Sequence, residues 1–159
     1  MAFTAHENYQ ATEVRTAPPQ KLQLMLIECA LLMANRAKQS WADGRSDIAL
    51  KSLMRAQNIL AEMMSTVDLD GGKIVNNVLA IDEFIYRNLV RAGSYRDEKA
   101  LADAIRVLER ERDNWRLVCE KLSAAESALS RSESTLRAPH FSLFSDFDSA
   151  VQGGFSVEA

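Results

Sequence analysis

The chain has 159 residues, enough for one domain with its own hydrophobic core and too few to favour a second. Its formal net charge is −3 and its acidic and basic residues are interspersed, so it has no basic stripe to neutralise phosphates, and we expect no nucleic-acid partner. It has neither a signal-peptide pattern nor an apolar run near the roughly 18 residues of a membrane span, so we expect a cytoplasmic protein without membrane insertion.

Helices are favoured over strands, because glycine, proline and β-branched clusters are scarce over residues 20–130. The first helix is predicted to run from about Pro18 to Ala42, with Thr16 as a capping hydroxyl. Pro19 biases Pro18 away from helical angles, so we expect the first turn to begin a residue or two late. Gly44 is expected to take the left-handed conformation that ends the helix.

This first helix is apolar on more than one face, and one neighbouring element cannot cover all of that surface. Something else must cover the remainder, which points to a protein whose work is binding. The two neighbouring stripes consist of Leu22, Leu26, Cys29, Met33 and Ala37, and of Leu24, Ile27 and Leu31, widened by Met25 and Leu32.

A second helix is predicted to open at Ser46 or Asp47 and to run to about Val67 with a bundle-type seam. Residues 68–72 (Asp-Leu-Asp-Gly-Gly) interrupt the pattern, because two glycines cannot continue a helix cheaply. The third helix carries its apolar face from residue 74 to residue 89 and ends near residues 92–93.

The fourth helix is expected to begin at Ser94 or Asp97 and to weaken after Leu129. Arg112 is the one charge in its seam, so we expect its aliphatic stem to pack while its guanidinium reaches the edge or a carboxylate. Trp115 in the same seam is expected to be a packing residue. Long helices with short connections pack as antiparallel neighbours. The predicted fold class is therefore all-α, an antiparallel four-helix bundle.

Three regions are expected: residues 1–15 as a short extended N-terminal segment lying on the bundle, residues 16–129 as the four-helix bundle, and residues 130–159 as a disordered tail. The tail is rich in serine and acid and contains no lysine. It nevertheless holds four of the chain's six phenylalanines, Phe141, Phe144, Phe147 and Phe155.

Residues suited to catalysis are poorly placed for it. The only histidines, His6 and His140, lie in the two tails, without the rigid pocket and orienting partner that a general base needs. Acidic pairs such as Asp82-Glu83 are expected to be solvated or to pair with basic residues on the same helix. Cys29 and Cys119 lack metal-ligand spacing and are expected to be buried, reduced thiols. We therefore expect no enzyme, no metal and no other cofactor.

The methionines leave two interpretations open. Five of the six fall on the first two helices, where a flexible, polarisable side chain suits a surface that accommodates a partner helix. Filling the core is the more common use of methionine, so each residue alone could be structural. The five are Met25, Met33, Met54, Met63 and Met64.

Four segments, in order and at matching spacing, follow the pattern of a known family. The chain resembles the flagellar secretion chaperones of the FliS family, which bind flagellin, over roughly residues 8–118. The segments are Tyr9-Gln10 with Val14 and Thr16-Ala17-Pro18-Pro19-Gln20-Lys21-Leu22; residues 67–74 with Asn77; Phe84 with Arg87, Leu89 and Ala92; and Leu108 with Arg112 and Trp115.

The chain departs from the family pattern at three places. Asp82 stands where the family often has a tyrosine, Asn114 replaces an alanine, and Glu28-Cys29-Ala30 stands where an acidic-Gly-Ala segment is common. Asp82 matters most, because the departure there is expected to change how the flagellin helix or the N-terminal segment docks.

The resemblance implies a cytosolic export chaperone. Such a protein binds the C-terminal disordered segment of flagellin, prevents premature polymerisation and delivers flagellin to the flagellar type III export apparatus, without a cofactor. The N-terminal segment is expected to lie on the bundle when cargo is absent and to move aside when cargo binds. The implied binding and switch residues are Tyr9, Gln10, Val14, Leu24, Met25, Ile27, Leu31, Asn77 and Phe84.

Alternatives stay open at this point. The bundle could instead be an adaptor or regulatory module for another amphipathic helix, and self-association in the absence of cargo is possible. The phenylalanine tail could occupy the cargo groove of its own chain, bind an export-gate component or another flagellar regulator, or make no fixed contact.

Overall fold

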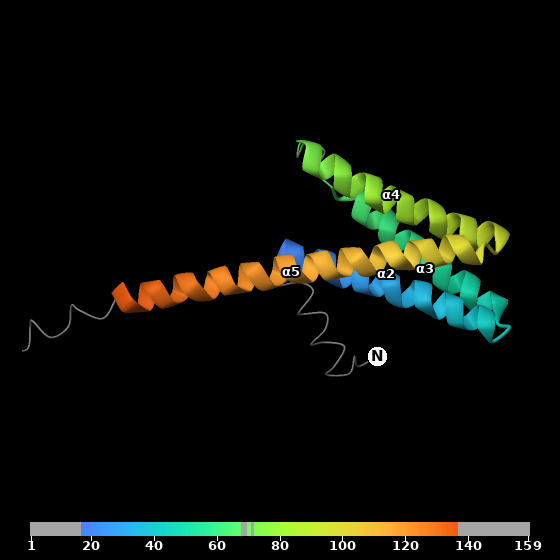
Figure 1. Cartoon of the computed structure of the whole chain (residues 1–159), viewed down its shortest axis with the longest axis horizontal. Helices are drawn as coiled ribbons and strands as arrows, with labels where there is room; N and C mark the ends of the chain where they lie inside the picture. Colours follow the sequence, from blue (N-terminus) through green and yellow to red (C-terminus); the bar gives the residue numbers. More distant parts are fainter. Residues whose placement is uncertain (1–16, 68–69, 71, 137–159) are drawn as a thin grey trace, which may run out of the picture. The chain divides into compact units, whose positions relative to one another are not determined.

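A computed structural model describes residues 17–67, 70 and 72–136 (Figure 1). Tyr9, Gln10, Val14 and Thr16 and the predicted phenylalanine tail lie outside these residues. The described part consists of four helices and contains no strand, which confirms the predicted all-α class. The helices are α2 (Pro19–Ala42), α3 (Ser46–Ser65), α4 (Gly72–Tyr95) and α5 (Glu98–Leu136).

The chain divides into two compact units, residues 1–119 and residues 120–159. In the first unit α2, α3 and α4 run in alternating directions, with α3 packed against both α2 and α4, and the beginning of α5 turns back from the end of α4 (Figure 1). This arrangement is the predicted antiparallel bundle. In the second unit, α5 continues past Leu129, where its pattern was expected to fade, and ends at Leu136.

Proline and glycine set the ends of α2 as the sequence predicts. The helix begins at Pro19, because Pro18 is extended, with φ −61° and ψ 153°. At the other end Gly44 has φ +72°, a left-handed conformation that favours glycine. The tight connection is closed when Arg45 N donates a hydrogen bond of 2.8 Å to the carbonyl of Ser40.

Asp97, rather than Ser94, marks the start of α5. The preceding helix α4 runs through to Tyr95, and the Asp97 carboxylate accepts a 2.9 Å hydrogen bond from Ala100 N. It also accepts one from Arg91 on α4 at 2.9 Å. These bonds lower the pKa of Asp97, with the backbone bond as the largest cause.

Alanine lines much of the interface between the helices. The core side chains of α2 include Ala30, Ala34 and Ala37, each fully buried, beside the larger Ile27. Small side chains let helix axes approach closely. Trp41 is also buried in this core, and Trp115 packs against it, as expected for Trp115. The remaining members of the buried cluster are Leu31, Ala49, Leu53, Ala56, Leu60, Met63, Ile85, Leu89, Ala92, Leu101, Ala104, Ile105 and Leu108.

The predicted burial of the two thiols is wrong. Cys29 is exposed and Cys119 is partly exposed. The buried face of α2 is centred on its alanines and on Ile27, which leaves Cys29 exposed, although Leu26, Met33 and Ala37 of the same predicted stripe are buried or pack against the core. The sequence prediction followed the large apolar residues of α2. It therefore missed that the helix buries a face made largely of alanines.

Candidate functional site

Helix α2 has apolar surface beyond what its neighbours bury. Leu32 exposes 62% of its surface, and Leu24 and Met25 are half-buried. Ile27 and Leu31 face the core instead. Leu32 is therefore apolar surface of α2 that no described neighbour buries, and a surface depression lies along each flank of the helix.

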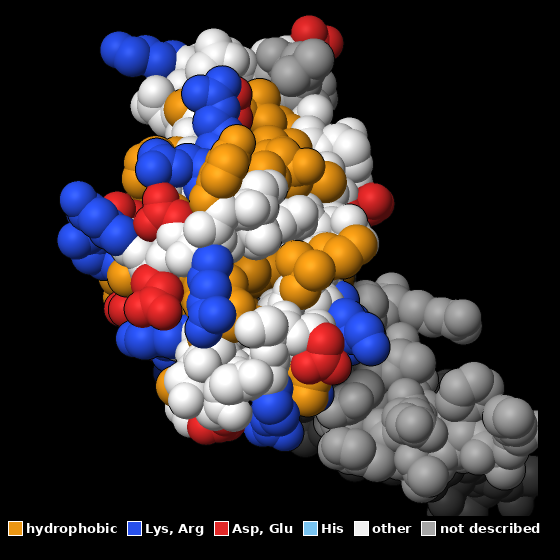
Figure 2. Space-filling view, turned by 90° about the vertical axis from the view of Figure 1, so that its right-hand side faces the viewer, with side chains coloured by type: hydrophobic (Ala, Val, Ile, Leu, Met, Phe, Trp, Pro, Cys, Tyr) orange, Lys and Arg blue, Asp and Glu red, His pale blue; other side chains and the backbone are white. Residues whose placement is uncertain are grey.

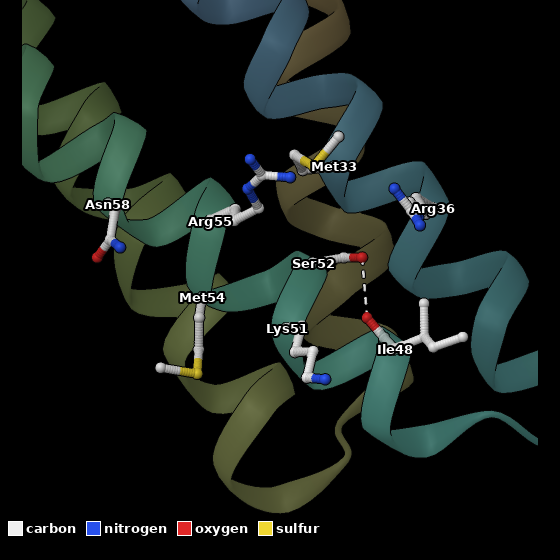
Figure 3. A pocket seen from close by; sticks show the side chains of 8 residues that line it. All are labelled: Met33, Arg36, Ile48, Lys51, Ser52, Met54, Arg55 and Asn58. Atoms are coloured by element: carbon white, nitrogen blue, oxygen red, sulfur yellow. Dashed lines mark hydrogen bonds between the residues drawn. The ribbon is translucent and has the colours of Figure 1, made fainter. Parts of the chain in front are cut away.

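The first depression, which we call the α2–α3 groove, has a volume of about 580 Å³. Its side chains come from two helices, with Met33 and Arg36 on α2 and the rest on α3 (Figure 3). Arg55 reaches from α3 into the space between the helices, toward Met33 (Figure 3). The lining combines apolar and cationic groups. It consists of Met33, Arg36, Ile48, Lys51, Ser52, Met54, Arg55 and Asn58.

The α2–α3 groove is electropositive. Arg36, Lys51 and Arg55 line it, and no described carboxylate does. Within the described part of the chain, none of these three cations forms an ion pair. Seen from the end of the bundle where α2 turns into α3, apolar side chains reach the surface between lysine and arginine side chains (Figure 2). The surface thus offers both apolar contact and uncompensated positive charge.

The second depression, the α2–α5 pocket, has a volume of about 380 Å³. Unlike those of the groove, its cations already have partners. Arg116 on α5 donates to the Glu28 carboxylate on α2, with Nη2 at 2.7 Å and Nε at 3.2 Å. Arg112 donates to Asp113 at 2.9 Å, as predicted for the one charge in this seam. The apolar part of the lining is Leu31 and Leu32, and Asn35 completes it.

The structure brings only some of the predicted binding residues together. Leu31 borders the α2–α5 pocket with part of its side chain while most of it is buried, and Ile27 is only 2% exposed. Asn77 and Phe84 are exposed on α4, and neither lines the groove or the pocket. Tyr9, Gln10 and Val14 lie outside the described residues.

The groove cations were not predicted, although the sequence contains a signal for two of them. Lys51 and Arg55 are four residues apart, so their like charges share one face of α3 without an acid between them. Such a pair is mildly destabilising in an isolated helix. Arg36 comes from the neighbouring helix, and its approach follows only from the packing of α2 on α3.

Asp82 is the buried charged group of the bundle. Its surface is only 3% exposed, and its Oδ2 has no hydrogen-bond partner in the described structure. Burial raises its pKa from 3.8 to about 6, and the nearby charge of Glu111 adds to the effect. The predicted solvated position is therefore wrong for Asp82. It holds for the adjacent Glu83, which is exposed and pairs with Arg87.

The described helices contain no candidate metal-binding cluster and no candidate membrane-spanning segment. No group of three or more histidine, cysteine, aspartate or glutamate side chains there could hold a metal ion. None of these helices is both long and apolar enough to cross a bilayer.

The sequence model of the family described as "Flagellar protein FliS" matches residues 1–122. The chain belongs to the FliS family. It is 30% identical over 108 residues to a Bacillus subtilis (strain 168) protein named "Flagellar secretion chaperone FliS", covering 68% of this chain and 80% of that relative. The FliS match spans all four helices of the first unit and ends soon after it, so the bundle with both depressions is the family's domain.

Proposed function

We propose that this FliS-family protein is a cytosolic chaperone for flagellin export. It holds the disordered C-terminal segment of flagellin, prevents its premature polymerisation and delivers it to the flagellar type III export apparatus. The family match over residues 1–122 carries the proposal. The name of the Bacillus subtilis relative, a flagellar secretion chaperone, supports it. The protein acts by binding, without catalysis and without a cofactor.

The apolar flank of α2 suits such a cargo. The terminal segments of flagellin are amphipathic helices that pack in the filament core, so an unassembled subunit exposes apolar stripes. A helical partner covers such a stripe by laying it against apolar side chains that recur at helical spacing. Leu24, Leu31 and Leu32 supply such spacing toward the α2–α5 pocket, with Met25 beside them. Because the cargo folds as it binds, its ordering entropy moderates the affinity and favours later release.

Two further groups of predicted residues enter the proposal as separate contacts. Phe84, 47% exposed, and Asn77 offer a second docking point on α4. Tyr9, Gln10 and Val14 cover the α2 surface until cargo displaces them. Deleting residues 1–14 tests the second idea, and unchanged flagellin affinity together with unchanged stability of the free protein would eliminate it.

Calorimetric titration with the C-terminal segment of flagellin from the same organism tests the function. We expect saturable binding and a weaker complex for Leu32→Glu, about tenfold, because a charge replaces an apolar contact worth roughly 1–1.5 kcal/mol. Leu32 is exposed, so the variant should fold. Tyr95→Ser is the matched control, since Tyr95 is 81% exposed and lines neither depression.

Two results would count against the proposal. Absence of binding to the full chain would reject flagellin as cargo and favour an adaptor for a different amphipathic helix. Equal loss of affinity in Leu32→Glu and Tyr95→Ser would keep flagellin as cargo but remove the α2 flank as its site.

A further inference from the structure

The α2–α3 groove lies wholly within the first unit, on the flank of α2 opposite the one assigned to flagellin. We propose that this groove binds an acidic amphipathic helix of a partner protein other than the cargo. The proposal goes beyond flagellin export and does not depend on flagellin binding. It rests on the positive charge of the groove, on the donor-only chemistry of its charged groups and on its apolar lining.

The groove is a positive region on a protein whose net charge is −3. Residues 29–42 of α2 and residues 48–61 of α3 supply the lining and contain neither aspartate nor glutamate. Within the described part of the chain, none of the cations that line the groove forms an ion pair. A carboxylate brought by a partner therefore meets positive charge that no residue has neutralised. The lining cations are Arg36, Lys51 and Arg55.

The charged groups of the groove only donate hydrogen bonds, because lysine and arginine side chains have no acceptor atom. The buried Ser52 adds little to them, since its hydroxyl donates a 2.9 Å bond to the carbonyl of Ile48 on its own helix (Figure 3). An occupant must therefore supply acceptors. Carboxylates are the protein groups that bind guanidinium and ammonium groups most strongly.

The apolar part of the lining favours a helix over a small anion. Met33, Ile48 and Met54 line the same groove as the cations, and Met54 is 54% exposed. A phosphate or another small anion would leave these side chains in water, whereas apolar groups of a partner would bury them. Methionine side chains adapt readily to such a partner. Apolar and anionic groups presented together are typical of an acidic amphipathic helix.

The dimensions of the groove suit about three turns of a helix. Its lining on α3 runs from Ile48 to Asn58, which is about 15 Å along the helix axis. Lys51 and Arg55 are four residues apart, so they can meet carboxylates spaced one turn apart on a helix that lies along α3. The groove has a volume of about 580 Å³ between two helices, a concave shape that a flat lipid surface would not fill.

The α2–α5 pocket lacks the same preference. Its Arg116 is already engaged by Glu28, and its Arg112 by Asp113. An incoming carboxylate would meet the negative charge of Glu28 and would have to displace an existing ion pair. The two flanks of α2 therefore differ in charge as well as in shape, and an acidic helix is expected on the α3 side.

Titration of the full chain with a synthetic peptide tests the proposal. The probe is a fluorescent peptide of about 15 residues, long enough for the groove, with leucines at helical spacing and glutamates on both sides of the leucine stripe. One control peptide has lysine in place of every glutamate, and a second has serine in place of every leucine. We expect saturable binding of the probe, about tenfold or more tighter than that of either control and weakened by added salt.

Charge reversal locates the site. The double variant Lys51→Glu/Arg55→Glu should weaken probe binding about tenfold or more, because attraction becomes repulsion at both positions. Lys38→Glu/Lys99→Glu is the matched control, since it changes the net charge equally at exposed positions outside the groove lining. All four positions are exposed, and a thermal melt verifies that each variant folds.

Methionine methyl NMR gives an independent readout of the position. The probe should shift the methyl signals of Met33 and Met54, which line the groove. Met63 is 1% exposed in the core, so its signal should stay unchanged and serves as the internal reference.

Five outcomes would overturn the proposal. Equal binding of the glutamate and lysine peptides would remove the charge preference, and an equal effect of the two double variants would remove the groove as the site. Competition between the probe and the C-terminal segment of flagellin would make the groove part of the cargo site. Binding to vesicles of phosphatidylcholine and phosphatidylglycerol, without binding of the probe, would assign the cations to lipid. Methionine shifts that grow with protein concentration in the absence of the probe would assign the groove to a second copy.

Discussion

Replacing Asp82 by asparagine removes the buried charge while keeping the volume of the side chain. The natural carboxylate is 3% exposed and lacks a partner for Oδ2 in the described structure. Its pKa rises from 3.8 to about 6, first through burial and second through Glu111. Since one pKa unit corresponds to about 1.4 kcal/mol, ionisation costs the folded protein about 3 kcal/mol at most. We expect Asp82→Asn to gain about 1–3 kcal/mol of unfolding free energy at pH 8.

The gain should depend on pH with a definite sign. Because the folded state holds its proton more tightly than the unfolded state, it binds more protons between pH 3.8 and about 6, and its stability falls as pH rises through that window. Below the window both forms of the natural protein are protonated and the advantage of the variant disappears. Above it the advantage reaches its full value.

Urea unfolding of both proteins at pH 4, 5, 6, 7 and 8 measures this difference. Glu83→Gln is the matched control, because Glu83 is the next residue on α4, is exposed and forms a surface pair with Arg87 worth less than about 1 kcal/mol. Glu111→Gln should give a smaller gain than Asp82→Asn, since its charge is the lesser cause. A gain at pH 8 equal to that at pH 4 would refute the electrostatic reasoning and indicate packing instead.

Three further outcomes follow from the fold. Leu53→Ala, at a fully buried position of α3, should lower the unfolding free energy by about 2–5 kcal/mol in urea titration, and a loss below 1 kcal/mol would contradict its place in the core. Gly44→Ala should cost about 1–2 kcal/mol in the same measurement, because φ is +72° while nothing lies within 4 Å of an added Cβ; a neutral result would exclude backbone strain there. Cys29, being exposed, should be alkylated in the native protein before Cys119, which mass spectrometry of timed samples would show or disprove.

Much of the bundle could be predicted from local signals. Pro18 and Pro19 place the start of α2, Gly44 places its end, and the capping carboxylate of Asp97 places the start of α5. Each of these acts through its own backbone or its immediate neighbours, so the sequence around it contains the whole cause.

Burial and charge compensation could not be predicted in the same way. The inward turn of Asp82 and the outward turn of Cys29 depend on which face of each helix meets its neighbours. The buried face of α2 is centred on alanines, and a prediction that follows the large apolar residues gives these small side chains too little weight. The groove cations Lys51 and Arg55 share a face by spacing alone, but their meeting with Arg36 depends on how α2 packs on α3.

The buried alanines of α2 bear on how the entropy cost of binding divides between this protein and its partner. Ala30, Ala34 and Ala37 are fully buried against the neighbouring helices. Alanine has no side-chain rotamers to freeze, so these three positions add no rotamer entropy cost when the helices pack. The outer side chains of α2 are thus held on a support that is already ordered before any partner arrives. The ordering cost of a complex on α2 then falls mainly on the partner, and its affinity should respond chiefly to the partner's own tendency to form a helix.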